Sequence, residues 1–157
     1  MGELTHIDGD GNPIMVDVSA KKVTVRTAIA ESRVRLGAEI ISLLKNNEIY
    51  TKKGPVFQTA IIAGTQGAKK TADLIPFCHP IGLEDCKIEI IIDQNDAVIR
   101  CATKVSAKTG VEMEAITGAT IAAVTIYDMC KALSKKIEIV NTRLIEKTGG
   151  KSDFKRE

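Results

Sequence analysis

The stretch that decides the fold is EDCKIEIIIDQNDAVIRCATKVS, at residues 84–106. Residues 84–93 and 97–106 both alternate apolar with polar side chains, and a period of two indicates strands with one buried face. The three residues between them, Gln-Asn-Asp, are typical of a tight turn. The sequence therefore predicts a β-hairpin here.

Two more strands are expected on either side of this hairpin in the sequence. Residues 23–36 are rich in Val, Ile and Thr with a partial period of two, which indicates a half-buried strand. Residues 137–145, IEIVNTRLI, alternate again and predict a last strand.

Two long helices are also predicted. Residues 111–133 carry apolar side chains at helical spacing, after the capping-box pattern of Thr109 and Glu112. Charged residues lie only near the two ends of this segment, so the helix should be mostly buried. Residues 56–73 are small and aliphatic and follow Pro55, which is a favourable residue at a helix start.

The connections carry the remaining signals. Residues 38–45 predict a short helix, and residues 45–55 contain charge and turn residues typical of an exposed loop. In LIPFCHP, at 74–80, two prolines exclude a regular element and predict a rigid turn.

This order of elements favours an α+β fold over a doubly wound one. A ferredoxin-like sandwich, with a mainly antiparallel sheet and helices on one face, satisfies it. All 157 residues are expected to form a single domain, in which residues 148–157 are a mobile tail. Lys147 and Lys151 are candidates to contact an anion there.

The composition excludes several classes of protein. A net charge of +2 is too small to indicate a nucleic-acid partner, and aromatic residues make up only 3% of the chain. The first residues show no secretory signal, and the longest apolar stretch, at 115–127, is too short to cross a bilayer. A cytoplasmic protein without a membrane partner is expected.

The four cysteines show no C-x-x-C spacing, which is consistent with reduced intracellular thiols. A zinc site built from Cys78, His79 and Cys86 would match no recurrent metal motif. No metal site and no cofactor are therefore predicted.

Two features indicate acid–base chemistry. Asp128 and Lys131 are three residues apart on the predicted helix, where a simple surface ion pair is the alternative interpretation. Their neighbours are apolar, and a desolvated lysine beside a carboxylate is one way to bring a proton-transfer group near neutral pH. His79 lies on the rigid turn, where a structural and a functional role are equally compatible with the sequence.

Long stretches of the chain resemble the MoaC family, the cyclic pyranopterin monophosphate synthases of molybdenum cofactor biosynthesis. The matching stretches are MVDVSAK (15–21), TVR (24–26), KKGPVF (52–57), AKKTADLIPFCHP (68–80), KTGVEMEAITGATIAAVTIYDMCKA (108–132) and TGGKS (148–152). The resemblance implies a ferredoxin-like fold and a homohexamer built as a trimer of dimers. It also implies a lyase that converts 3′,8-cyclo-7,8-dihydroguanosine 5′-triphosphate to cyclic pyranopterin monophosphate with release of pyrophosphate.

The resemblance further implies the site residues. Catalytic roles fall on Lys53, Asp128 and Lys131. Substrate contacts fall on two groups of three neighbours: Phe77, Cys78 and His79, and Glu112, Met113 and Glu114. No cofactor is expected; Mg²⁺ assistance to the triphosphate stays open, but nothing in the sequence indicates it.

One alternative stays open, a nucleotide- or RNA-binding module without turnover on the same fold. It would need aromatic side chains on the sheet, and neither strand of the hairpin at 84–106 contains Phe or Tyr.

A geometric expectation follows if Glu114 and Asp128 serve one site. At 1.5 Å per residue they lie about 21 Å apart along one helix, so a two-fold interface between subunits would be needed to bring them together.

Overall fold

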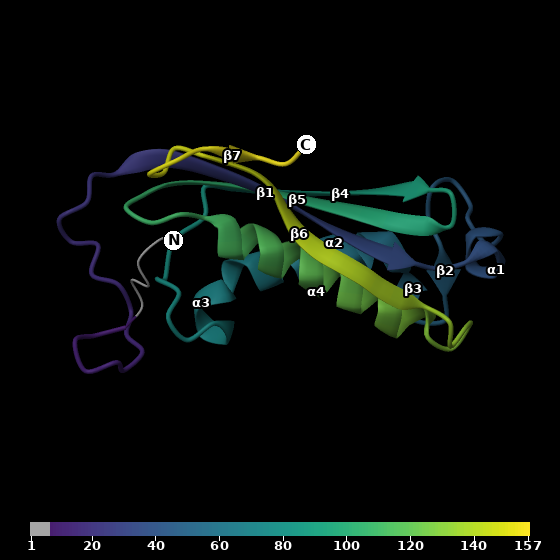
Figure 1. The fold of residues 1–157 in the computed structure, drawn as a ribbon. Helices are drawn as coiled ribbons and strands as arrows, with labels where there is room; N and C mark the ends of the chain where they lie inside the picture. Colours follow the sequence, from purple (N-terminus) through teal and green to yellow (C-terminus); the bar gives the residue numbers. More distant parts are fainter. Residues whose placement is uncertain (1–6) are drawn as a thin grey trace.

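The computed structural model describes residues 7–157, in which helices cover one face of an antiparallel sheet (Figure 1). The first six residues of the expected domain lie outside the described part of the chain. The elements are β1 (Thr24–Arg35), α1 (Ala38–Ile41), β2 (Tyr50–Thr51), β3 (Gly54–Pro55), α2 (Val56–Lys69), α3 (Thr71–Leu74), β4 (Asp85–Asp93), β5 (Asp96–Ala107), α4 (Glu112–Cys130), β6 (Glu138–Thr148) and β7 (Phe154–Lys155).

The sheet confirms the predicted ferredoxin-like α+β fold. Its order is β4-β5-β1-β6-β7, so the first strand lies in the middle, between the second strand of the predicted hairpin and the last long strand. β1 pairs antiparallel with β5 and β6, and β4 pairs antiparallel with β5. This arrangement places α2 and α4 on the same face, since each follows a strand and returns across that side of the sheet.

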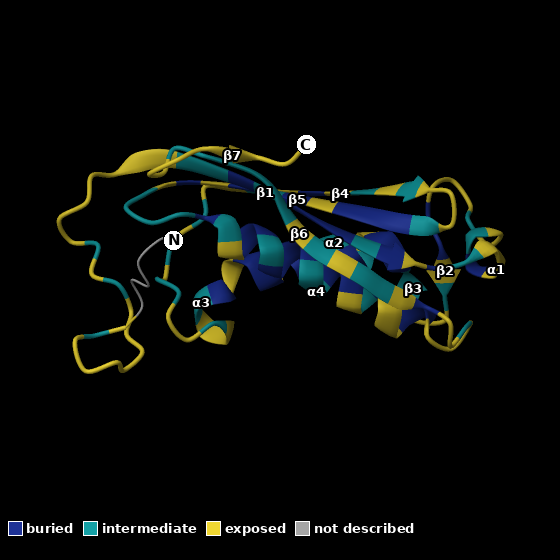
Figure 2. Cartoon of the chain, viewed as in Figure 1, coloured by how far each residue is buried: buried dark blue, intermediate teal, exposed yellow. Residues whose placement is uncertain are grey.

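Close packing of small residues brings the two long helices together beneath the sheet. A Cβ on Gly64 of α2 would lie 2.7 Å from the carbonyl oxygen of Gly118 of α4, so only glycine allows this approach. The buried face of α4 is formed by Ala115, Ala119, Ala122, Ala123 and Ile126. Figure 2 shows dark buried residues where α2 and α4 lie beneath the sheet, and exposed residues along the lower edge of α4. α4 is mostly buried, as its apolar spacing predicts.

The start of α4 differs in detail from the prediction. The N-cap position is Val111, and no side chain caps the helix, so the Thr109–Glu112 capping box does not form. The carboxylate of Glu112 instead accepts a hydrogen bond from Lys147 of β6 at 2.9 Å. Glu112 thus pairs with Lys147 of a distant strand, and not with the backbone of the preceding residues as the capping box would require.

Two predicted helices are shorter than their patterns. The segment at 56–73 forms α2 and then α3, because α2 ends at Lys69. The segment at 38–45 forms only the four residues of α1.

The segment at 45–55 is only in part the exposed loop that the sequence predicts. Ile49 is fully buried and Glu48 nearly so, while β2 and β3 form a two-residue hairpin. Glu48 and Ile49, which come just before this hairpin, are part of the core, although the charge and turn residues around them are typical of an exposed loop.

Residues 148–157, expected to be a mobile tail, are held against the sheet instead. β7 pairs with β6, and Arg156 donates a hydrogen bond from Nε to the carbonyl oxygen of Leu144 at 2.9 Å. Gly149 makes the turn possible because its φ is +81°, and a Cβ there would collide with the backbone of Val25. None of the helices in residues 7–157 is long and apolar enough to cross a membrane.

Candidate functional site

Lys53, Asp128 and Lys131 meet at the end of the molecule that carries the β2–β3 hairpin; we call them the lysine cluster. Lys53 donates to Oδ2 of Asp128 and Lys131 donates to Oδ1, each at 2.7 Å. One carboxylate therefore holds two ammonium groups, one on each oxygen.

Two separate elements supply this cluster. Lys53 lies in the turn between β2 and β3, whereas Asp128 and Lys131 come from the last turn of α4 and the residue that follows it. Lys53 also donates to the main-chain carbonyl oxygen of Asp128 at 3.3 Å. Carbonyl groups at a helix C-terminus carry partial negative charge, which favours a cation at this position.

The pairing keeps Asp128 and Lys131 charged. Hydrogen bonds from Lys131 and Lys53 lower the pKa of Asp128 to about 2, and the same contact with Asp128 raises the pKa of Lys131. Their side chains are 49% and 58% exposed. The interpretation of a desolvated lysine poised near neutral pH is therefore wrong for this chain, because solvent and the ion pair both stabilise the charged form.

The cluster faces an open cavity of about 550 Å³. Tyr50, Met129 and Leu133 also line this cavity and add apolar surface to it. A planar heterocycle carrying a phosphate would find both kinds of contact here.

The six residues expected to contact substrate also lie together, around a second cavity of about 280 Å³. We call them the carboxylate cluster: Phe77, Cys78, His79, Glu112, Met113 and Glu114. The rigid turn after α3 supplies the first three, and the first turn of α4 supplies the others.

Glu114 is the most perturbed group of the carboxylate cluster. Its side chain is only 4% exposed, and burial, followed by the nearby charge of Glu112, raises its pKa to about 7. Glu112 differs because Lys147 neutralises it across 2.9 Å. Of these two neighbouring carboxyl groups, Glu112 is paired with a lysine, whereas Glu114 titrates near neutral pH.

His79 is tied to the N-terminal segment. Its Nε2 donates to the carbonyl oxygen of Val16 at 2.7 Å, and Lys108 donates to the carbonyl oxygen of Ser19 at the same distance. These bonds hold residues 15–21 beside the turn of the carboxylate cluster. Burial raises the pKa of the neighbouring Cys78 thiol, which stays protonated.

A group of cations borders the carboxylate cluster; the sequence singled out Lys147 and Lys151 as candidates to contact an anion, but gave Arg26 no role. Arg26, Lys147 and Lys151 line a small adjoining cavity that shares Gly110 and Glu112 with the larger one. The sequence offered a weak signal, since TVR and TGGKS both matched the family pattern. Only the pairing of β1 with β6 shows that these three cations lie around the same cavity.

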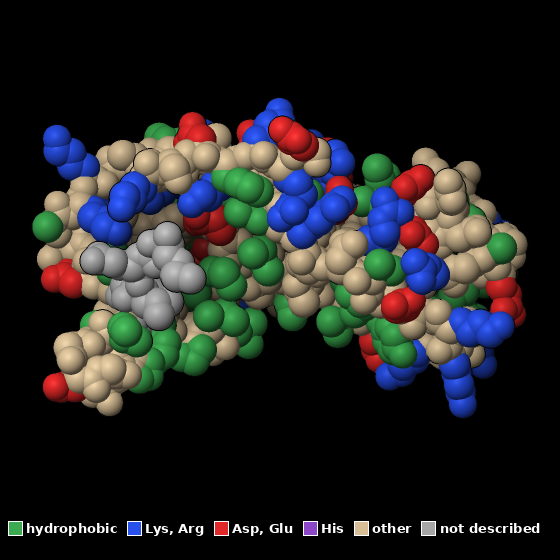
Figure 3. Space-filling model, in the orientation of Figure 1, with side chains coloured by type: hydrophobic (Ala, Val, Ile, Leu, Met, Phe, Trp, Pro, Cys, Tyr) green, Lys and Arg blue, Asp and Glu red, His purple; other side chains and the backbone are tan. Residues whose placement is uncertain are grey.

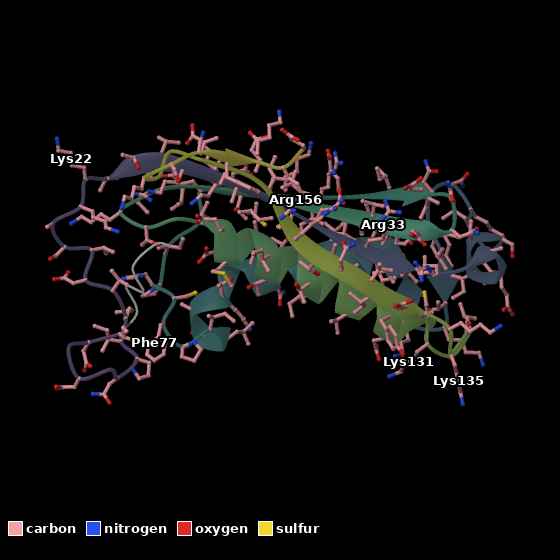
Figure 4. All side chains as sticks on the ribbon, viewed as in Figure 1. Lys22, Arg33, Phe77, Lys131, Lys135 and Arg156 are labelled. Carbon is pink, nitrogen blue, oxygen red and sulfur yellow. The ribbon has the colours of Figure 1, made fainter. Side chains whose placement is uncertain are left out.

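The two clusters do not meet within one chain. They lie at opposite ends of α4, and Figure 4 shows Phe77 and Lys131 at opposite ends of the molecule. The 14 residues from Glu114 to Asp128 correspond to about 21 Å of helix.

Fold and site together define a class: a ferredoxin-like protein with an ion-pair cluster at one end of its long helix and a carboxylate-lined cavity, bordered by cations, at the other. A family model described as the MoaC family matches residues 15–150. The chain belongs to the MoaC family.

Relatives of two lengths match this chain. It is 51% identical to the cyclic pyranopterin monophosphate synthase of Xanthomonas oryzae pv. oryzae, over 96% of this chain and 92% of that protein. It is 53% identical to the molybdenum cofactor biosynthesis protein 1 of Dictyostelium discoideum, with 96% of this chain and 27% of that protein aligned. It is also 53% identical to the molybdenum cofactor biosynthesis bifunctional protein of a Synechocystis strain, with 96% of this chain and 45% of that protein aligned. The chain thus spans less than half the length of the two longer relatives.

Proposed function

We propose that the protein is a cyclic pyranopterin monophosphate synthase acting in molybdenum cofactor biosynthesis. Its reaction would convert 3′,8-cyclo-7,8-dihydroguanosine 5′-triphosphate to cyclic pyranopterin monophosphate and pyrophosphate. The observation that carries the proposal is the convergence of Lys53 and Lys131 on one carboxylate beside an open cavity, in a chain half identical to a synthase of similar length.

The lysine cluster suits the chemistry of this conversion. Opening the purine-derived ring and closing the pyran ring require proton transfers, for which Asp128 and Lys131 are the proposed pair. Closing the cyclic phosphate expels pyrophosphate, and a cation such as Lys53 stabilises the charge that develops on the phosphate oxygens. Bound substrate would replace part of the solvent around these groups, so their proton affinities in the complex differ from those in the free chain.

The carboxylate cluster suits the recognition of the base. A carboxylate accepts hydrogen bonds from the guanidine-like edge of a reduced guanine, and Glu114 is proposed for this contact. Phe77 and Met113, each more than a third exposed, offer apolar contact to the ring. The cations Arg26, Lys147 and Lys151 beside this cavity are proposed partners of the triphosphate.

A complete site would need two subunits. The lysine cluster and the carboxylate cluster are too far apart on one chain to contact one small substrate. The simplest solution is a two-fold interface at which the lysine cluster of one subunit faces the carboxylate cluster of its neighbour. We propose such dimers, assembled as the homohexamer of three dimers that the family resemblance implies.

The proposal requires no resident metal or organic cofactor, and it is compatible with Mg²⁺ that arrives with the triphosphate. A nucleotide-derived substrate also fits a cytoplasmic enzyme. An RNA-binding module would typically concentrate basic side chains in a stripe. On the face shown in Figure 3, basic and acidic side chains are interspersed.

The test is turnover of the proposed substrate. Purified protein is incubated with the enzymatically prepared triphosphate, and pyrophosphate and oxidised pterin product are quantified by chromatography. Equal molar amounts of both products are expected. Tight binding of the triphosphate without either product would instead support a binding module.

A further inference from the structure

Glu48 is a buried carboxylate that belongs to neither cluster. It is 6% exposed, and its two oxygens accept hydrogen bonds from three main-chain N–H groups. Oε1 accepts from Ile49 and Phe57, both at 2.8 Å, and Oε2 accepts from Gln58 at 3.1 Å. A charged group is stable in such a place only when its hydrogen bonds are satisfied, as they are here.

Two of these donors, the N–H groups of Phe57 and Gln58, lie in the first turn of α2, where N–H groups have no acceptor within the helix itself. Pro55 occupies the N-cap position of α2 and provides no side-chain cap. Glu48, seven residues before Pro55, accepts the hydrogen bonds of these N–H groups in place of an N-cap side chain. Its negative charge lies at the positive end of the helix dipole. The bonds therefore join the beginning and the end of segment 48–58.

Lys53 lies at the tip of the loop that these bonds close. β2 and β3 pair through only two residues each, and so short a hairpin is not stable by itself. Buried Ile49 and Val56 flank the base of this hairpin, and Glu48 connects the two sides there. The position of Lys53 over α4 thus depends on a contact outside the lysine cluster.

Glu48 also lies near the last turn of α4: burial raises the pKa of the Cys130 thiol, and the charge of Glu48 raises it further. Cys130 is two residues from Asp128.

From this geometry we infer that Glu48 is a positioning residue, whose bonds to Ile49, Phe57 and Gln58 hold Lys53 within reach of Asp128. The expected effect on rate rests on the proposed synthase activity; the effect on the placement of Lys53 does not.

The test compares Glu48→Gln with wild type in two measurements. The amide keeps the shape of the side chain, but its NH₂ group cannot accept, so at least one of the three bonds is lost. The matched control is Glu39→Gln, which changes an exposed carboxylate of α1 outside both clusters. Circular dichroism first selects a temperature at which all proteins are folded, and Glu48→Asp replaces Glu48→Gln if the latter does not fold.

The first measurement is the acetylation rate of individual lysines by an amine-reactive ester, read by peptide mass spectrometry. In Glu48→Gln, Lys53 should react at least about threefold faster than in wild type, because its ion pair with Asp128 is no longer held. Lys131 should react as before, since its pair with Asp128 lies within α4 and the residue that follows it. General loosening of the fold would accelerate both lysines and would contradict a positioning role.

The second measurement is steady-state turnover. A displacement of about 1 Å can cost about 100-fold in rate, so kcat should fall between tenfold and 100-fold while KM changes less than about threefold. Glu39→Gln should match wild type. An unchanged kcat in folded Glu48→Gln would overturn the inference. A reduced kcat with an unchanged acetylation rate of Lys53 would overturn it as well. If wild type itself shows no turnover, the acetylation rates still decide whether Glu48 places Lys53.

Discussion

Lys131 donates to Oδ1 of Asp128 at 2.7 Å, across less than one turn at the end of α4. Lys53 reaches the other oxygen of the same carboxylate from the β2–β3 hairpin. Because both lysines are at least half exposed, their ion pairs contribute little to folding. Their removal should therefore affect chemistry far more than stability.

Lys53→Ala and Lys131→Ala should each abolish product formation while the protein stays folded and assembled. The measurement is pterin product per subunit, accompanied by thermal unfolding and gel filtration. Activity within a factor of two of wild type in either variant would remove that lysine from the proposed mechanism.

Glu114→Ala and Asp128→Ala proteins should each be inactive but should rescue each other if the site is shared between subunits. After unfolding and co-refolding of an equal mixture, about half the dimers are mixed, and each contains one intact site of two. Activity should recover to roughly a quarter of wild type. If mass spectrometry shows mixed oligomers and no activity returns, both residues of each site belong to one chain.

Glu114 should make the stability of the protein depend on pH. Its pKa rises from 4.5 to about 7 on folding, because burial disfavours the charged carboxylate. The folded state thus binds the proton more tightly, and the contribution of this group is fully present below pH 4.5 and is lost as pH rises through 7. The loss amounts to at most about 3 kcal/mol.

Glu114→Gln should remove this dependence. Urea unfolding between pH 4.5 and 8 should show a smaller decline in the free energy of unfolding for Glu114→Gln than for wild type, and Glu39→Gln should decline as wild type does. Parallel curves for all three proteins would show that Glu114 is ionised in the folded chain at neutral pH.

Gly64→Ala should destabilise the fold although alanine favours helices. The added Cβ would lie 2.6 Å from Ile88 Cδ1 and 2.7 Å from the Gly118 carbonyl oxygen, so α2 and α4 must separate. Overpacking of this kind costs about 1–3 kcal/mol, more than the roughly 1 kcal/mol of helix propensity gained. Urea unfolding measures the change, and Gly82→Ala, where a Cβ meets no atom within 4 Å, is the control. An unchanged or increased free energy of unfolding would refute tight helix contact.

Chelation should leave the fold intact. Within residues 7–157 no group of three or more metal-ligating side chains lies together, so metal-dependent folding is not expected. Thermal unfolding with and without a chelator checks this, and a large fall in melting temperature would contradict it.

The periodic elements could be predicted from the sequence alone. Strand and helix patterns depend on neighbours two to four residues away, which is why the hairpin of β4 and β5 and the long helix α4 were found close to their observed bounds. The family stretches likewise named the residues of both clusters, and the helix spacing by itself predicted that Glu114 and Asp128 lie about 21 Å apart along one helix.

Only the tertiary structure decided the environment of each charge. Glu48 reads as part of an exposed charged loop, yet it is buried because its three N–H donors come from the adjoining residue and from a helix start 9 and 10 residues later. Lys131 reads as desolvated beside apolar neighbours, yet its side chain is 58% exposed, because Cys130 packs into the core while Lys131 pairs with Asp128 at the surface. Arg26 and Lys147 share one cavity because β1 and β6, more than 100 residues apart, are paired in the sheet. Burial and charge pairing depend on which distant segments pack together, and that information lies in the assembled core and not in any local stretch of sequence.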